Sequence, residues 1–248
     1  MTFPVILQLG PLSVSAHAAL EFLAYVSGFA LYRRRRAQLA DPLDNLTRWR
    51  LLAAAALGAL LGARLLAWVG DPAALAAYPW WLRPFAAKTI VGGLLGGTLA
   101  VEAAKRRLGI ARRTGDVYAE PLALAILIGR LGCFLQGVED HTCGVPSGLP
   151  WALDQGDGVP RHPAALYEAL GCGLLLLLLG RLRRRPHAEG DLFRAFLLGY
   201  CLLRFGLEFI KPYPRVLGLT AYQWACLALL LAWRRDLFRL LKGPPAHA

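Results

Sequence analysis

The sequence predicts an all-α polytopic membrane protein, a fold class indicated by its composition, its apolar segments and its basic clusters. Hydrophobic residues make up 56% of the 248 residues and charged residues only 18%, with a mean hydropathy of +0.44. Such an apolar chain has too little polar surface to coat a water-facing globule. The same figures exclude a disordered chain, a collagen-like chain and a disulfide-rich secreted fold. We therefore predict a single membrane domain over residues 1–248.

Seven apolar segments are candidates for transmembrane helices. A helix needs about 20 apolar residues to cross roughly 30 Å of hydrocarbon. The segments are approximately residues 14–32, 51–69, 89–104, 121–137, 163–180, 192–210 and 221–233. The third is short, but its glycines, Gly92, Gly93, Gly96 and Gly97, provide a face on which another helix can pack closely. We find no cleavable signal peptide and expect the first segment to stay as a span.

The basic residues indicate the orientation of these segments. Clusters of Arg and Lys follow the first, third, fifth and seventh segments, whereas few follow the others. The positive-inside rule then places the N-terminus outside and the C-terminus in the cytoplasm. The formal net charge of +12, from 28 basic and 16 acidic residues, therefore reflects topology, and no nucleic-acid partner is expected.

The connection after the fourth segment, residues 137–161, departs from the apolar pattern. It is the most polar and turn-rich stretch of the chain, with several glycines, three prolines and the ionisable residues Glu139, Asp140, His141, Asp154 and Asp157. A loop of this length in a compact protein is usually functional. We predict an outer polar arm that lies over the membrane face.

Several predicted spans contain ionisable side chains. They are His17 and Glu21 in the first, Arg64 in the second, Arg130 in the fourth, Glu168 in the fifth, and Arg204 with Glu208 in the sixth. Because a charge at the bilayer centre costs about 2.5–3.5 kcal/mol, these groups should face a protein interior. His17 and Glu21 are four residues apart, as are Arg204 and Glu208, so the two members of each set can form an ion pair. One interpretation is a set of ion pairs that tie the helices together.

A second interpretation rests on the excess of arginine. In sequence, arginines outnumber acidic residues around Arg130 and Arg204, which calls for an anion from outside the chain. The planar guanidinium suits a phosphate, which it can hold through two parallel charged hydrogen bonds. In a membrane the available phosphate belongs to a lipid headgroup. We therefore predict a cavity near the outer leaflet that binds an anionic phospholipid.

Three stretches of the chain carry a family resemblance. Residues 129–134 (GRLGCF) resemble the pattern Gly-Arg-x-Gly-Asn-Phe, residues 161–168 (RHPAALYE) resemble Arg-His-Pro-Ser-Gln-Leu-Tyr-Glu, and residues 199–209 resemble a helix with Gly-Tyr, Arg and Glu-Phe. These patterns are typical of the prolipoprotein diacylglyceryl transferases. Their order and spacing agree over nearly the whole chain, so it resembles a divergent member of that family.

The resemblance implies a multi-pass enzyme of the bacterial cytoplasmic (inner) membrane. Such an enzyme moves the diacylglyceryl group of phosphatidylglycerol to the lipobox cysteine thiol of a precursor protein and releases glycerol phosphate, with no metal or soluble cofactor. It implies that Arg130 and Arg204 hold the phosphate and that Tyr200 and Glu208 position it. The remaining positions implied for the phospholipid cavity are Arg64, Cys133, Arg161, Tyr167 and Glu168.

Departures from the family pattern fall where the acceptor thiol would be activated. A histidine of the third span is Val91 here, and the asparagine of the arginine motif is Cys133. Two histidines can supply the missing base: His141 beside Asp140, or His17 in the first span with Glu21. Each also has an ordinary alternative, since His141 can be a solvated loop residue and His17 can simply pair with Glu21. A lipid thioether on Cys133 is disfavoured because it would be hard to reverse.

The function therefore has three candidates. The first is diacylglyceryl transfer to a prolipoprotein cysteine. The second is a paralogue that uses the same phospholipid donor with another acceptor, because the lost histidine and asparagine touch the chemistry of the acceptor. The third is a non-catalytic protein that binds or translocates lipid, against which the polar clusters of the predicted arm argue.

Overall fold

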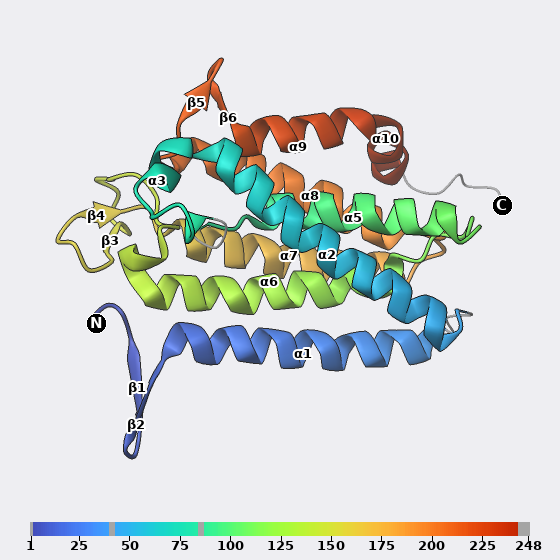
Figure 1. Ribbon diagram of the computed structural model, residues 1–248, viewed down its shortest axis with the longest axis horizontal. Coiled ribbons are helices and arrows are strands. Elements are labelled where there is room, and N and C mark those ends of the chain that lie inside the picture. The colour runs from blue at the N-terminus through green and yellow to red at the C-terminus, as the bar shows by residue number, and fades with distance from the viewer. Residues whose placement is uncertain (1, 40–42, 84–86, 243–248) are drawn as a thin grey trace. The chain divides into compact units, whose positions relative to one another are not determined.

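The computed structural model describes residues 2–39, 43–83 and 87–242, which form helices and three short two-stranded sheets (Figure 1). The chain divides into two compact units. The first unit comprises Met1–Leu39, Thr114–Pro212 and Asp236–Ala248. The second comprises Ala40–Arg113 and Tyr213–Arg235.

Helix α6 is central to the first unit. The long helices of this unit are α1 (Ala16–Gln38), α6 (Asp116–Gln136), α7 (Ala164–Arg183) and α8 (Asp191–Leu207). Helix α6 packs against each of the other three, and α7 also packs on α8 (Figure 1). The short 3-10 turns η1 (Gly137–Asp140) and η2 (Glu208–Ile210) continue α6 and α8. Side chains late in α6 and α8 can therefore meet side chains early in α7.

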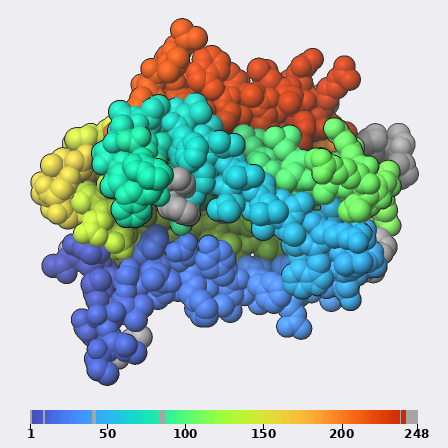
Figure 2. All heavy atoms as spheres, viewed as in Figure 1, coloured from blue at the N-terminus to red at the C-terminus, as the bar shows by residue number. Residues whose placement is uncertain are grey.

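A β-hairpin precedes α1, and the sequence analysis did not predict it. Strands β1 (Ile6–Leu9) and β2 (Leu12–Ser15) pair antiparallel, and the hairpin extends away from the helices of its unit at the lower left of Figure 2. The turn uses Gly10 at φ +63°, a conformation that glycine adopts without steric cost. The helix of the first predicted span begins at Ala16, two residues after the approximate start at residue 14, because strand β2 occupies Leu12–Ser15.

A buried carboxylate joins three helices of the first unit. Glu120 of α6 is only 4% exposed. Arg35 of α1 donates from Nη2 to Oε1 of Glu120 at 2.9 Å, and Nε of Arg183 in α7 lies 3.4 Å from Oε2. Both arginines stand in the last turn of their helices, where a positive charge also stabilises the helix dipole. Two members of the basic clusters therefore have a packing role.

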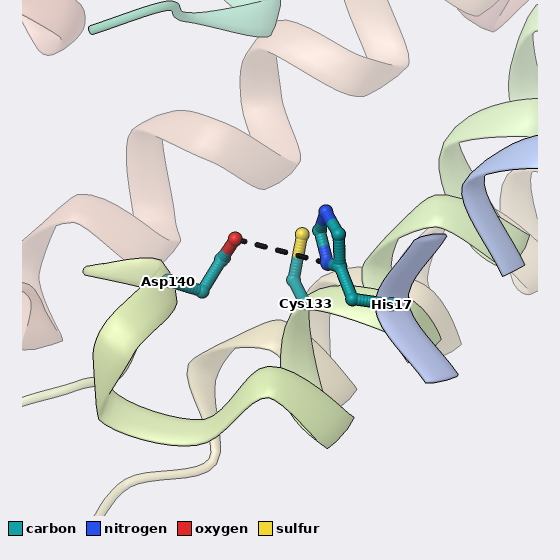
Figure 3. A group of neighbouring side chains, drawn as sticks. All are labelled: His17, Cys133 and Asp140. Atoms are coloured by element: carbon teal, nitrogen blue, oxygen red, sulfur yellow. Dashed lines mark ion pairs between the residues drawn. The ribbon is translucent and has the colours of Figure 1, made fainter. Parts of the chain in front are cut away.

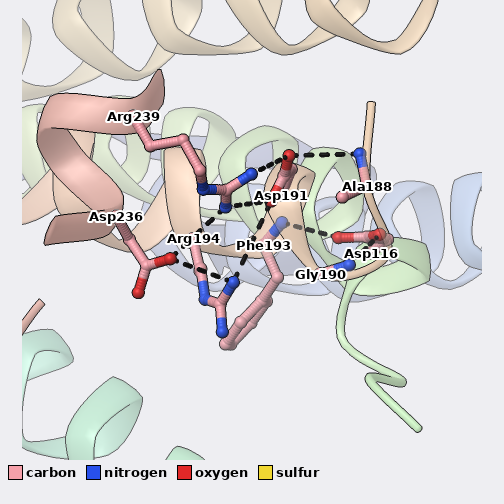
Figure 4. A network of polar contacts seen from close by, with 8 residues as sticks. All are labelled: Asp116, Ala188, Gly190, Asp191, Phe193, Arg194, Asp236 and Arg239. Carbon is pink, nitrogen blue, oxygen red and sulfur yellow. Dashed lines mark hydrogen bonds and ion pairs between the residues drawn. The ribbon is translucent and has the colours of Figure 1, made fainter. Parts of the chain in front are cut away.

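Two aspartates connect the start of α8 to its neighbours (Figure 4). Asp116, at the start of α6, accepts hydrogen bonds from the backbone N–H groups of Gly190 at 2.6 Å and Phe193 at 3.0 Å. Asp191 accepts from Nη1 of Arg239 at 2.9 Å, and Arg239 belongs to α10 (Arg234–Lys242). This network connects α6, α8 and α10.

The second unit is built on a glycine contact. Its elements are α2 (Asn45–Gly70), α3 (Pro72–Ala76), α5 (Ile90–Arg107), β5 (Arg215–Val216), β6 (Leu219–Thr220) and α9 (Ala221–Ala232). A Cβ atom on Gly62 or on Gly92 would collide with the carbonyl oxygen of the other, and Gly58 and Gly96 stand in the same relation. The predicted small-residue face of the third segment is confirmed, because α2 and α5 approach to backbone contact there.

The helices are consistent with a membrane protein. Each of the seven predicted segments contains a helix, namely α1, α2, α5, α6, α7, α8 and α9. Among the described residues, Asn45–Gly70, Asp116–Asp140 and Ala164–Arg183 are long and apolar enough to cross a membrane, and Ala221–Ala232 is a shorter apolar helix. The predicted arm contains η1 and the paired strands β3 (Leu153–Asp154) and β4 (Pro160–Arg161).

Candidate functional site

A buried ionic cluster lies where α6, α7 and α8 meet in the first unit. Its centre is Glu168, in the second turn of α7, whose side chain is fully buried. Nε of Arg130, late in α6, lies 3.0 Å from Oε1 of Glu168. Nη1 of Arg204, in the last turn of α8, lies 3.1 Å from Oε2. The two arginines singled out from the sequence therefore meet on one carboxylate.

Three further buried side chains complete the cluster. The hydroxyl of Tyr200 donates to Oε1 of Glu168 at 2.6 Å, and Glu208 accepts from Nη2 of Arg204. The ammonium of Lys211, only 2% exposed, lies 3.7 Å from Oε2 of Glu168. Burial, with repulsion from Arg204, lowers the pKa of Lys211 to about 7. Sequence reasoning missed Lys211, although its place three residues after Glu208 was a usable signal.

These contacts correct the prediction that arginines outnumber their acidic partners around Arg130 and Arg204. Glu168 pairs with both arginines and Glu208 with Arg204. The predicted pairing of Arg204 with Glu208 is confirmed. Because Lys211 adds a third cation to two carboxylates, the cluster retains one excess positive charge while Lys211 is protonated. Glu168 is thus the hub of the cluster and not merely part of a cavity wall.

A second group of side chains, drawn in Figure 3, contacts this cluster through Arg130. His17 of α1, Cys133 of α6 and Asp140 of η1 point toward one another, with their potential ligand atoms all within 4.8 Å. Nδ1 of His17 lies 3.9 Å from Oδ1 of Asp140. Nη1 of Arg130 donates to Sγ of Cys133 at 3.6 Å, which connects this group to the ionic cluster. We name these three residues the His-Cys-Asp group.

The His-Cys-Asp group unites two positions that the sequence analysis treated as separate alternatives. Asp140 was paired with His141, and His17 with Glu21. The second pairing is confirmed at 3.7 Å between Nε2 of His17 and Oε2 of Glu21. Asp140 instead approaches His17, whereas the side chain of His141 is exposed and its backbone is left-handed, at φ +56°.

The stretch of residues 161–168 divides between the arm and α7. Arg161, in β4, donates from Nη2 to Asp157 at 2.6 Å, and this hydrogen bond raises the pKa of Arg161 and lowers that of Asp157. The hydroxyl of Tyr167 accepts from Nε1 of Trp151 at 2.7 Å. Arg161 and Tyr167 therefore both have hydrogen-bond partners in the arm, and neither contact involves Glu168.

Two of the sequence-selected positions belong to the second unit. Arg64, in α2, donates from Nη1 to the carbonyl oxygen of Ala87 at 3.3 Å. Val91, in α5, is only 1% exposed, so the position at which the family pattern has a histidine is a buried aliphatic residue. Cys133 and Cys143, in the first unit, are both free thiols, so no disulfide joins them.

The chain is similar to known proteins along nearly its whole length. The family described as prolipoprotein diacylglyceryl transferase matches residues 4–234. The phosphatidylglycerol–prolipoprotein diacylglyceryl transferase of Methylococcus capsulatus is 33% identical, over 99% of this chain and 95% of its own. The proteins of that name from Bordetella parapertussis and Aromatoleum aromaticum are each 32% identical, over 98% of this chain and 97% of their own.

Proposed function

We propose that the chain, which belongs to the prolipoprotein diacylglyceryl transferase family, transfers the diacylglyceryl group of phosphatidylglycerol to a cysteine thiol of a prolipoprotein. This function rests on the family match over residues 4–234, and relatives named as such transferases align with the chain over nearly their whole length. The chain is thus a transferase of lipoprotein biosynthesis, and glycerol phosphate is the second product.

The ionic cluster suits the donor half of this reaction. A sulfur atom attacks the glycerol carbon that bears the phosphate, the carbon–oxygen bond breaks, and the electron pair remains on the leaving phosphate. Cations fixed in a dry site stabilise such a developing charge without reorganising. Arg130, Arg204 and Lys211 outnumber Glu168 and Glu208 by one charge. The phosphate would take up this excess charge.

The His-Cys-Asp group suits the acceptor half. The attacking thiol must lose its proton, since the thiolate is the nucleophile. We assign His17 as the group that accepts this proton, with Asp140 and Glu21 on its two ring nitrogens. Because Arg130 contacts Cys133, this acceptor group would lie next to the proposed phosphate site. Arg161 and Tyr167, which have hydrogen-bond partners in the arm, would form part of the wall of the phospholipid cavity.

The membrane arrangement is part of the same proposal. We propose one membrane domain in which seven helices cross the bacterial inner membrane, with the N-terminus outside. Basic residues occupy the last turns of α1, α5 and α7, as the positive-inside rule requires of their cytoplasmic ends. In the first unit, Arg130 late in α6, Glu168 early in α7 and Arg204 at the end of α8 would then all lie toward the outer leaflet.

A second candidate, the same donor with a different acceptor, is favoured by Val91. A buried valine cannot take a proton, so position 91 cannot supply the base that the family pattern has there. Purified protein incubated with phosphatidylglycerol labelled in its terminal glycerol and with a lipobox peptide decides between the candidates. Labelled glycerol phosphate with a lipidated peptide supports prolipoprotein transfer. Release only with another thiol or amine acceptor supports the second candidate, and binding without release supports a lipid-binding protein.

A further inference from the structure

The His-Cys-Asp group has the composition of a metal site. A histidine nitrogen, a cysteine sulfur and a carboxylate oxygen are the three ligand types that zinc takes in proteins. The thiolate disfavours Mg²⁺ and Ca²⁺, which prefer oxygen ligands. We propose that His17, Cys133 and Asp140 bind one zinc-class divalent cation. The family pattern, which has an asparagine at position 133, implies no such site.

The geometry is close to that of a bound cation. Zinc–ligand distances of about 2.0–2.3 Å place tetrahedral ligands roughly 3.3–3.8 Å apart. The three ligand atoms lie within 4.8 Å of one another, and the nitrogen and oxygen of His17 and Asp140 within 3.9 Å. Small side-chain rotations, with a movement of about 1 Å or less, bring them to these distances. Nδ1 of His17 is buried and has no hydrogen-bond partner among the described residues, as expected of a nitrogen that faces a cation.

Groups outside the three ligands hold them in orientation. Glu21 lies 3.7 Å from Nε2 of His17, the nitrogen opposite the one that approaches Asp140, and Tyr25 donates to Glu21 at 3.4 Å. A carboxylate on the second nitrogen fixes the tautomer of a metal-binding histidine. The hydroxyl of Thr142 donates to Oδ2 of Asp140 at 2.6 Å, which leaves Oδ1 toward His17. Both polar ligands therefore have the supporting contacts typical of metal sites.

The charge balance gives the cation a chemical role, which rests on the proposed function. A neutral His17, a Cys133 thiolate and an Asp140 carboxylate cancel the charge of one divalent cation. Three protein ligands leave a fourth position open, as in catalytic zinc sites. A thiol that binds there is deprotonated outright, and its proton passes to water. The resulting acceptor thiolate would lie near Arg130, which contacts Cys133.

The transfer step then needs no oxidant or reductant. The bound sulfur forms the carbon–sulfur bond to the glycerol carbon while the bond from that carbon to the phosphate oxygen breaks. The electron pair leaves with glycerol phosphate, and the cation stays in its oxidation state. In this form of the reaction the cation lowers the pKa of the bound thiol and water takes its proton, so His17 acts as a ligand in place of its role as the base of the metal-free site.

Metal binding is tested directly on the full chain in detergent. Protein purified without chelator is analysed for metal content, then stripped with chelator and titrated with Zn²⁺ and with Co²⁺ as a spectroscopic probe. We expect one cation per chain and a sulfur-to-cobalt charge-transfer band with the visible spectrum of tetrahedral cobalt. Mn²⁺ and Mg²⁺ should not compete.

Variants assign the ligands. We expect Cys133→Ser to abolish the charge-transfer band, and His17→Ala and Asp140→Asn to weaken zinc binding by more than the about 10- to 100-fold typical of outer contacts. Glu21→Gln should weaken binding within that 10- to 100-fold range at unchanged stoichiometry. Cys143→Ser is the matched control, because this free thiol lies outside the group, and it should bind like the wild type.

The outcomes separate this inference from the proposed function. Absence of stoichiometric metal, an unchanged cobalt spectrum in Cys133→Ser, or a full transfer rate after chelation would overturn the zinc site while leaving the transferase intact. A bound cation in a protein that releases no glycerol phosphate from phosphatidylglycerol would establish the site and overturn the function. Loss of transfer on chelation, restored by Zn²⁺, supports both.

Discussion

The carboxylate of Glu168 in α7 lies 3.0 Å from Nε of Arg130 in α6, and both side chains are buried. The same carboxylate pairs with Arg204, so one acidic residue of α7 holds basic residues of two neighbouring helices. A buried charge is tolerated when it is paired and hydrogen-bonded. The arrangement therefore fixes where three helices of the first unit meet, and it positions the cations proposed to bind phosphate.

Replacement of Glu168 by glutamine tests this structural role. The variant leaves Arg130, Arg204 and Lys211 with Glu208 as the remaining carboxylate of the cluster. Loss of one partner from a buried ion pair typically costs about 3–5 kcal/mol. We expect a large drop in thermal stability in detergent, measured by circular dichroism. Glu139→Gln, which changes an exposed carboxylate, is the control and should stay within about 0.5 kcal/mol of wild type. Equal stability of the two variants would contradict the hub role.

Replacement of Arg204 by lysine tests the phosphate site. Lysine keeps the charge but loses the planar fork that binds two oxygens at once. We expect kcat for transfer to fall by about 10- to 100-fold, since removing one donor to a developing oxyanion typically costs about 10²–10³ and the charge is kept. Arg185→Lys, an exposed arginine after α7, should retain the wild-type rate. A wild-type rate in Arg204→Lys would remove Arg204 from the reaction.

The pH dependence of donor binding follows from Lys211. Its pKa of about 7 means that the ammonium loses its charge as pH rises through neutrality, which removes the excess positive charge of the cluster. We expect the KM for phosphatidylglycerol to rise by about 10-fold above pH 7, since a charged hydrogen bond is worth about 1.5 kcal/mol or more. Lys211→Arg, which stays charged, should abolish this rise. A pH-independent KM in the wild type would count against the role of Lys211.

The lowered pKa of Lys211 also predicts that the stability of the folded chain rises with pH, whereas donor binding weakens. Its pKa is about 7 when folded and near the ordinary 10.5 when unfolded, so the unfolded chain binds more protons between these values. Stability therefore rises with pH over this window. Thermal unfolding of Lys211→Met, which cannot titrate at this position, should show a smaller rise from pH 7 to 10 than the wild type. Parallel curves would show that Lys211 is not the group responsible.

The glycine contact of the second unit gives a matched pair of substitutions. A methyl group on Gly92 would collide with Gly62, whereas on Gly93 it would meet ordinary contacts at 3.6 Å and 3.8 Å. Both changes gain the same helix propensity, so their difference reports the collision. We expect Gly92→Ala to be less stable than Gly93→Ala by about 1–3 kcal/mol. Equal melting temperatures of the two variants would contradict the close approach of α2 and α5.

Much of the helical architecture could be predicted from the sequence because long apolar segments are a strong local signal. The hairpin before α1 could not, since β1 and β2 are short apolar stretches that merge with the following helix. Contacts between residues that are distant in sequence could not be predicted either. Glu120 meets Arg35 over 85 positions, and nothing local to either residue indicates the contact.

The sequence predicted most residues of the candidate site but few of the contacts between their side chains. Arg130, Arg204 and Glu168 stand in motifs, but only the fold reveals that Glu168 lies between the arginines. Cys133 was noted as a departure from the family pattern, and His17 as a candidate for the missing base. Their meeting with Asp140 depends on the packing of α1 against α6, which sequence spacing does not encode.

The proposed binding of the leaving phosphate by Arg130 is tested by the rate of glycerol phosphate release from phosphatidylglycerol in the wild type and in Arg130→Gln. In the presence of a lipobox peptide, we expect one glycerol phosphate per lipidated peptide for the wild type. We expect release about 10²–10³-fold slower for folded Arg130→Gln. Equal rates in the two proteins, or wild-type lipidation of the peptide without glycerol phosphate, would contradict the proposal.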